Sequence, residues 1–142
     1  MKEHLILRVV TKLMLPFILL FGFYIQLHGE ISPGGGFQAG IVLASAFILH
    51  GLIFGLEAVQ KILPRLAVIR LSAFGLLIYT GVGAATLVMQ GELLNYSVLS
   101  DNPIQGQHLG IWLVELGVMT TVTSVMILIY YIFGGHRPEA GR

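Results

Sequence analysis

Residues 13–56, LMLPFILLFGFYIQLHGEISPGGGFQAGIVLASAFILHGLIFGL, contain two apolar segments separated by one polar, glycine-rich run. The run covers residues 28–40 and includes three consecutive glycines, Gly34, Gly35 and Gly36. Glycine loses more backbone entropy on folding than any other residue and offers no side chain for packing. Three glycines in a row therefore indicate a backbone shape that other residues could not adopt, at the mouth of the second apolar segment.

Composition places these segments in a lipid bilayer. Of the 142 residues, 56% are hydrophobic and 11% are charged, and the mean hydropathy is +0.87. A soluble domain of this length is less apolar. A hydrocarbon core of about 30 Å needs roughly 20 apolar residues of helix, and four segments meet that requirement, at approximately residues 5–27, 37–56, 66–89 and 109–133. We predict an all-α integral membrane protein, a single membrane domain over residues 1–142 built as a bundle of four transmembrane helices.

The first segment has basic residues in its opening turns. Arg8 and Lys12 must extend their side chains toward the headgroups, and the apolar part begins at Leu5 or at Leu13. A signal peptide is the alternative interpretation. Against it, the basic region extends to Lys12 and no small-x-small cleavage site precedes His28. We interpret the segment as a retained membrane anchor.

The distribution of basic residues predicts the orientation of the chain. The lysines and arginines open the first segment, surround the second connection or lie in the C-terminal tail. They are Lys2, Arg8, Lys12, Lys61, Arg65, Arg70, Arg137 and Arg142. The connections at residues 28–36 and 90–108 contain none. The positive-inside rule therefore predicts that both termini are cytoplasmic and that the glycine run faces the outer side of the membrane.

Two ionisable residues are expected at membrane depth. If the fourth helix starts at Leu109, Glu115 lies about 9 Å below its outer end, at a rise of roughly 1.5 Å per residue. Glu115 is either a protonated acid hydrogen-bonded to a neighbouring helix or a site that handles protons or cations. His50 lies about 20 Å from Phe37 by the same rise, and we expect a neutral imidazole with a backbone or hydroxyl partner. Because their depths differ, the two residues are not expected to touch.

No cofactor or metal site is predicted. The chain has no cysteine, which excludes disulfides, thiolate zinc sites and cysteine-held iron–sulfur clusters. A haem between paired histidines is rejected because His50 has no second histidine at its depth. His28 and His108 both belong to outer connections, but two histidines from separate loops do not define a metal site. The basic residues form membrane anchors, so nucleic-acid binding is not predicted either.

The residues of the glycine run admit two interpretations. Successive backbone amides before a helix can bind an anion, but the Gly-x-x-x-x-Gly-Lys-Ser/Thr spacing of nucleotide sites is missing and no strand precedes the run. A tight re-entry turn is favoured, with Ser32 as the helix cap, Pro33 setting the direction and Phe37 opening the helix. Gln26 and Gln38 flank this turn and are placed to satisfy its backbone groups.

Pairs of small residues spaced four apart indicate close packing between helices. The pairs are Gly40 with Ala44, Gly51 with Gly55, and Gly81 with Ala85. Small residues let transmembrane helices approach one another closely. Four helices enclose little interior, so this many small residues predicts neighbours outside the chain. We therefore expect a subunit of a larger assembly.

A resemblance to a known family rests on residues 33–40, PGGGFQAG, which follow His28 and Gly29 between the first two of four short membrane helices. This stretch resembles the signature of the B subunit of the Mrp-type multisubunit Na+/H+ antiporter, and the likeness covers nearly the whole chain in length and topology. It implies an accessory, non-enzymatic, multi-pass subunit of the cytoplasmic membrane, with other subunits as partners and Na+ and H+ as the ions of the complex. The functional loop that it implies comprises Gly29, Pro33, Gly34, Gly35, Gly36, Phe37 and Gln38.

The resemblance leaves the parent complex open, because related subunits occur in the membrane arms of energy-converting hydrogenases. The chain has no lysine within the core of any predicted helix, so we do not expect a complete transporter. We expect a subunit needed for assembly that lines part of the cation path. The alternatives are a membrane-arm subunit of a hydrogenase-like complex and a purely structural scaffold.

Overall fold

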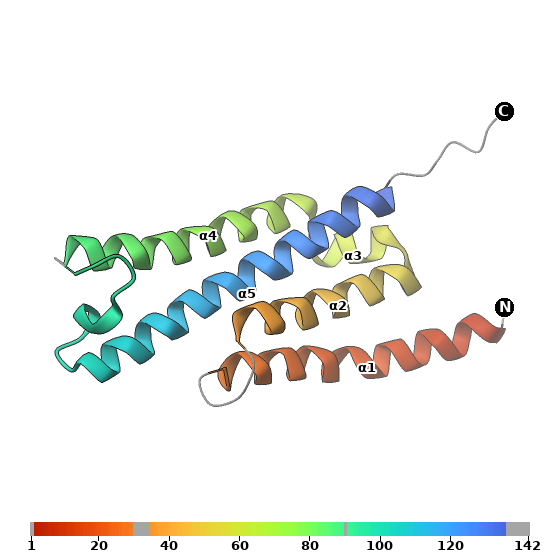
Figure 1. Cartoon of the computed structure of the whole chain (residues 1–142). Coiled ribbons are helices and arrows are strands. Elements are labelled where there is room, and N and C mark those ends of the chain that lie inside the picture. The colour runs from red at the N-terminus through yellow and green to blue at the C-terminus, as the bar shows by residue number, and fades with distance from the viewer. Residues whose placement is uncertain (1, 30–34, 90, 136–142) are drawn as a thin grey trace.

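The computed structural model describes residues 2–29, 35–89 and 91–135, and every regular element in these ranges is a helix (Figure 1). The elements are α1 (Lys2–Leu27), α2 (Gly36–Phe54), α3 (Leu56–Ile62), α4 (Arg65–Val88), the 3₁₀ helix η1 (Tyr96–Leu99) and α5 (Pro103–Gly135). Four of them, α1, α2, α4 and α5, are long and apolar enough to cross a membrane. The prediction of an all-helical membrane protein with four spanning helices is confirmed.

Helix α5 is the central element of the bundle. It packs against α4 on one side and α2 on the other, while α1 packs mainly against α2 (Figure 1). Figure 1 also shows that the start of α1, the end of α5 and the short α3 lie at the same end of the molecule. The end of α1 and the start of α2 lie toward the other end, partway along α5.

Small residues line the crossings of α5 with its neighbours. Gly40 of α2 faces Val122 of α5, and Gly75 of α4 faces Gly117 of α5, so that an added Cβ would clash at either glycine. Close approach of this kind strengthens the van der Waals packing that helps to hold helices together in lipid. Gly81 of α4 has no atom within 4 Å of where its Cβ would lie. The predicted small residues therefore serve the contacts of the bundle only in part.

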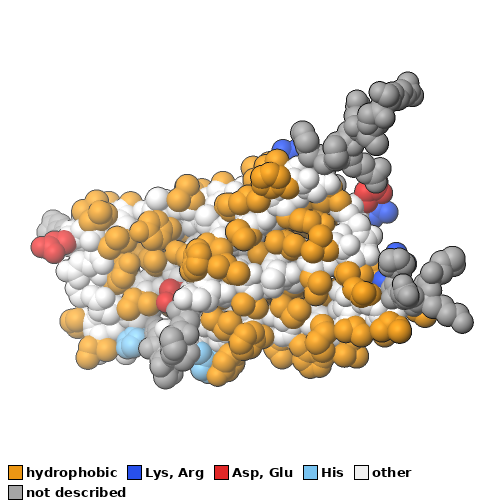
Figure 2. Space-filling model, turned by 45° about the vertical axis from the view of Figure 1, so that its right-hand side comes forward, with side chains coloured by type: hydrophobic (Ala, Val, Ile, Leu, Met, Phe, Trp, Pro, Cys, Tyr) orange, Lys and Arg blue, Asp and Glu red, His pale blue; other side chains and the backbone are white. Residues whose placement is uncertain are grey.

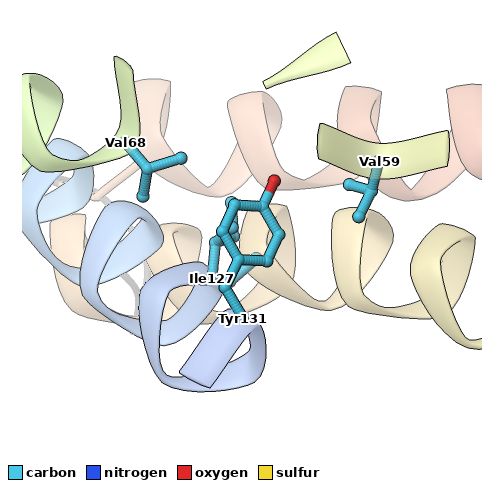
Figure 3. Packing of buried hydrophobic residues seen from close by; sticks show 5 residues of the cluster. Val59, Val68, Ile127 and Tyr131 are labelled. Atoms are coloured by element: carbon cyan, nitrogen blue, oxygen red, sulfur yellow. The ribbon is translucent and has the colours of Figure 1, made fainter. Parts of the chain in front are cut away.

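A buried apolar cluster holds the end of the bundle that contains α3 (Figure 3). Its members are Ala44, Val59, Val68, Ile127 and Tyr131. The Tyr131 hydroxyl donates a hydrogen bond of 2.8 Å to the backbone carbonyl of Leu63, just beyond α3. This contact joins the connection between α3 and α4 to the central helix.

The second apolar segment does not form one helix as far as Leu56. Helix α2 ends at Phe54, and Gly55 adopts φ 96° and ψ 156° before α3 begins. This backbone conformation is open almost only to glycine. The predicted helix 37–56 is therefore wrong at its end, because the chain bends at Gly55 into a separate short helix.

The last helix starts earlier than predicted, at Pro103 instead of Leu109. The Asn102 side chain accepts a hydrogen bond of 3.0 Å from the backbone N–H of Ile104, and Pro103 occupies the first helical position. Asparagine is a favoured N-cap and proline a favoured first residue, since its missing N–H has no partner there in any case. Pro103 therefore starts the helix six residues before the predicted start at Leu109.

The surface of the bundle is largely apolar, and its basic side chains gather at one end (Figure 2). At that end Arg8 and Lys12 of α1 lie 5.7 Å and 5.6 Å from the ring centroid of Phe54 at the end of α2. Only 11% of the spanning part of α1 is buried within the chain, against 33% for α2. Helix α1 therefore presents most of its apolar surface to lipid or to neighbouring proteins.

Candidate functional site at the glycine loop and Glu115

The part of the glycine run that joins α1 to α2, residues 28–35, is called the glycine loop here. Both of its ends meet the side chain of Glu115. A Cβ at Gly29 would lie 2.8 Å from Oε2 of Glu115, and a Cβ at Gly35 would lie 3.0 Å from Oε1. A Cβ at Gly36 would overlap the backbone carbonyl of Glu115 itself. The glycines that precede and open α2 therefore let the chain pass directly over the carboxylate of α5.

The conformation of Gly35 explains how α2 begins at this point. Gly35 is the N-cap residue of α2, with φ 128° and ψ −173°, and no side chain caps the helix. Its carbonyl accepts the first helical hydrogen bond, 3.0 Å from the backbone N of Ala39. The expectation that Ser32 caps the helix is therefore wrong, because the cap lies three residues later at a glycine-only conformation.

The Glu115 carboxylate lies beside the N-terminus of α2. The first N–H groups of a helix have no partner within the helix, and the helix dipole carries partial positive charge at that end. The first turn of α2 contains no acidic residue of its own. Glu115 thus places, from another helix, a carboxyl group at a helix end that favours negative charge.

Glu115 lies deeper along its helix than we predicted. Because α5 starts at Pro103, Glu115 lies about 18 Å from the start of the helix at roughly 1.5 Å per residue, in place of the 9 Å expected. It is also the one acidic residue in the candidate membrane spans Leu5–Leu27, Gly36–Phe54, Arg65–Val88 and Pro103–Gly135. Gly29 and Gly35 lie at the level of this residue.

A groove between α1 and α5 opens beside Glu115. We call it the α1–α5 groove; its volume is about 440 Å³, and leucine side chains of both helices line it together with Gln26, Gln105, His108, Trp112 and Glu115. Gln26 is 4% exposed, and neither its amide oxygen nor its amide nitrogen has a hydrogen-bond partner within the described part of the chain. The expectation that Gln26 satisfies the backbone of the turn is therefore not met.

The remaining residues of the predicted loop have separate placements. Phe37 is 57% exposed in the first turn of α2, and the neighbouring Gln38 is also exposed. Ser32, Pro33 and Gly34 lie outside the described residues. The structure thus joins Gly29, Gly35 and Gly36 to Glu115 and turns Phe37 toward the surroundings of the chain.

His50 belongs to a different part of the molecule. It lines an apolar hollow of about 180 Å³ with residues such as Leu15 and Phe47, and its ring centroid lies 4.8 Å from that of Phe54. Its Nδ1 is buried and has no hydrogen-bond partner among the described residues. We expected a backbone or hydroxyl partner for the imidazole, and Nδ1 has none among the described residues.

The histidines of the outer connections also differ in their surroundings. The ring of His28 stacks on Tyr24 with centroids 4.1 Å apart, and its Nδ1 lies 3.1 Å from the Tyr24 carbonyl. His108 lines the α1–α5 groove. Among the described residues, no three His, Cys, Asp or Glu side chains are placed together as metal ligands.

Comparison with known proteins identifies the family of the chain. Residues 6–128 match the model of a domain described as related to the MnhB subunit of Na+/H+ antiporter. Proteins of three Staphylococcus aureus strains, Newman, JH1 and Mu3, carry the name "Putative antiporter subunit mnhB2". Each is 37% identical over 145 residues, which cover 96% of this chain and 99% of the relative. The chain therefore belongs to the family of domains related to the MnhB subunit of Na+/H+ antiporters.

Proposed function

We propose that the chain is a non-enzymatic, accessory subunit of a heteromeric antiporter that exchanges Na+ for H+ across the cell membrane. The observation that carries this proposal is the meeting of the glycine loop with Glu115. Gly29, Gly35 and Gly36 surround the one acidic side chain that lies within the four candidate membrane spans. An acidic residue within a membrane helix is expensive to keep and is a functional candidate for that reason.

The exposed surface of the chain favours contacts with other proteins in addition to lipid. Helix α1 is only 11% buried in its spanning part, and Gly81 of α4 has open space where its Cβ would lie. A small residue on an outward face lets another helix approach closely. Other subunits of the antiporter are the partners that fit these faces.

The charge distribution supports an orientation with both termini in the cytoplasm. Lys61, Arg65 and Arg70 lie in and after α3, at the end of the bundle shared by the start of α1 and the end of α5 (Figure 1). The positive-inside rule assigns this end to the cytoplasm and the glycine loop to the outer side.

Orientation is testable because the chain has no cysteine of its own. Single substitutions Ser100→Cys, beyond η1, and Gln60→Cys, in α3, provide one thiol at each end. A membrane-impermeant maleimide added to intact cells should label Ser100→Cys and label Gln60→Cys only after the membrane is opened. The reverse pattern would overturn the orientation.

The role of the loop is tested by antiport measurements in everted vesicles that contain the whole complex. We expect Phe37→Ala and Pro33→Gly to lower Na+/H+ exchange more than they lower the amount of subunit in the membrane. Phe74→Ala is the matched control, since Phe74 of α4 is 58% exposed and Phe37 is 57% exposed. Normal exchange in both loop variants would remove the loop from the mechanism.

The parent complex is identified by what co-purifies with the chain in mild detergent. Large antiporter subunits support the proposal, whereas nickel and iron–sulfur proteins indicate a hydrogenase-like complex. A purely structural scaffold tolerates Glu115→Gln without a change in the apparent Na+ affinity or pH profile of exchange, provided that the complex assembles.

A further inference from the structure

We propose that a groove on the outer face of α4 binds an anionic phospholipid, with Arg70 as the residue that recognises the headgroup phosphate. We call it the α4 groove; its volume is about 700 Å³, and Arg70 lines it together with apolar residues such as Leu66, Ala67 and Leu71. Ligand pockets commonly have volumes of roughly 300–1,000 Å³. This inference goes beyond the proposed function, since it concerns the lipid around the chain and not the ions that the complex exchanges.

The α4 groove opens to the outside of the bundle. Helix α4 lies at one edge and packs chiefly against α5 (Figure 1), through a buried face that includes Val68 and Gly75. On the groove, Leu66 is 56% exposed and Leu71 is 40% exposed. A lipid from the bilayer therefore reaches the groove without displacing any described helix.

The depth of Arg70 matches the boundary between the hydrocarbon core and the headgroups. Helix α4 ends at Val88, 18 residues after Arg70, which is about 27 Å of helix at roughly 1.5 Å per residue. The hydrocarbon core is about 30 Å thick, so Arg70 lies near one edge of the core when the rest of α4 spans it. Side chains of a helix lean toward its N-terminus, which for Arg70 is the direction of the nearer headgroups.

The charges at this end of the bundle favour an anion. Arg70 forms no ion pair within the described part of the chain, and no acidic residue lines the groove. Arg65 opens α4 and Lys61 lies in the last turn of α3, so further positive charge is close in the chain. Glu57, the acidic residue of α3, lines a separate hollow with Gly55. A lipid phosphate supplies the negative charge that the groove lacks.

A neighbouring subunit is the competing occupant, because Gly81 further along α4 also has open space beside it. A protein partner would have to bring an acidic side chain to Arg70 within an otherwise apolar contact, and removing both charges from water is costly. Lipid phosphates lie at the depth of Arg70 all around the chain, and their acyl chains suit the leucine side chains of the groove. Lipid is therefore the occupant that the groove fits better.

Fluorescence quenching by brominated lipids measures which lipid occupies the α4 groove. Leu71→Trp places an indole in the groove, and Trp112→Phe removes the single tryptophan of the natural chain. The full chain with both changes is reconstituted in vesicles of phosphatidylcholine and phosphatidylglycerol, and in each series one of the two lipids carries bromine in its acyl chains. We expect phosphatidylglycerol to bind about fivefold more tightly at the indole, the factor that corresponds to about 1 kcal/mol for one basic residue near the membrane surface. Equal quenching by the two lipids would overturn the proposal.

Three substitutions in this background assign the preference to Arg70. Because Arg70 is exposed, Arg70→Gln should fold normally and lose the preference, whereas Arg70→Lys keeps the charge and should retain most of it. Arg65→Gln is the matched control: it makes the same change five residues earlier in α4, and Arg65 does not line the groove. An unchanged preference in Arg70→Gln, or an equal loss in Arg65→Gln, would mean that general surface charge attracts the lipid, and would overturn the site.

The assembled protein decides between lipid and another subunit as the occupant. Membranes in which the chain is assembled with its partners are loaded with phosphatidylglycerol that carries a photoactivatable group in its acyl chain, and the crosslinked peptides are identified by mass spectrometry. We expect crosslinks in α4 near Leu66 and Leu71, which are reduced by Arg70→Gln and retained in Arg65→Gln. Crosslinks that form with the purified chain and are lost in the assembly would show that a subunit covers the groove, and would overturn the proposal.

Discussion

Gly36, the first residue of α2, lies directly against the backbone carbonyl of Glu115 in α5, with no room for a Cβ between them. This contact sets the position of α2 along α5 and brings the glycine loop to the Glu115 side chain. The triple-glycine run is thereby explained in part by packing: at its last position, a larger residue would push α2 away from the central helix.

Gly36→Ala should destabilise the chain through this contact. Overpacking in a well-packed interior usually lowers the free energy of unfolding by about 1–3 kcal/mol, and the opposing atom here is backbone, which cannot rotate away. The measurement is reversible unfolding of the purified chain in mixed micelles. Gly81→Ala is the control, since its Cβ meets no atom within 4 Å; equal losses in both variants would contradict the contact.

Gly55→Ala should destabilise the chain through backbone strain alone. Gly55 has φ 96° and ψ 156° and no atom within 4 Å of a Cβ, and this region of backbone space costs other residues about 1–3 kcal/mol. Gly55→Asn should be no better, because asparagine tolerates the left-handed helical region and not this one. In Gly134→Ala the new methyl makes only ordinary contacts, so a comparable loss there would argue against strain as the cause.

Tyr131→Phe should weaken the contact between α5 and the residues that directly follow α3. The variant removes the 2.8 Å hydrogen bond to the part-buried carbonyl of Leu63, which is worth about 0.5–1.5 kcal/mol. Tyr130→Phe is the control, because it makes the same chemical change at the preceding residue. Tyr130 makes no side-chain hydrogen bond among the described residues. Hydrogen exchange of the α3 amides should rise in the first variant and stay constant in the second.

The stability of the chain should fall at alkaline pH partly because of Tyr96 in η1. Burial, and secondarily the nearby Tyr79, raise the pKa of the Tyr96 phenol above its ordinary value of 10.0. The unfolded chain then loses this proton first, so the contribution of Tyr96 is complete below pH 10 or so and is lost as the pH rises through the folded-state pKa. Tyr96→Phe should show a shallower alkaline decline in unfolding midpoint; an identical decline would exclude Tyr96 as its source.

The positions of the spanning helices could be predicted more reliably than their ends. Length and hydropathy located all four, because each apolar segment must match the thickness of the bilayer. The start of α5 was missed although Asn102 and Pro103 form a helix-start signal; the polar residues before them suggested a loop. The bend at Gly55 was missed because a glycine inside an apolar segment also suits close helix packing.

The candidate site was predicted as separate parts. The glycine run and Glu115 each stood out by composition, but nothing in their spacing indicated that they touch. Gln26 was assigned to the turn between α1 and α2 because it lies close to that turn in the sequence. Its burial between α1 and α5 depends on how these two helices pack, which no local sequence pattern reports.

The amino-acid sequence alone was enough to establish a membrane protein of four helices and its family, because bilayer thickness and an unusual glycine motif are both local constraints. The meeting of Gly29, Gly35 and Gly36 with Glu115 was decided by the packing of α2 on α5. Such a contact joins residues far apart in the chain, and it follows from where small residues allow two helices to approach. The same packing leaves the Gln26 amide buried without a hydrogen-bond partner in the described part of the chain.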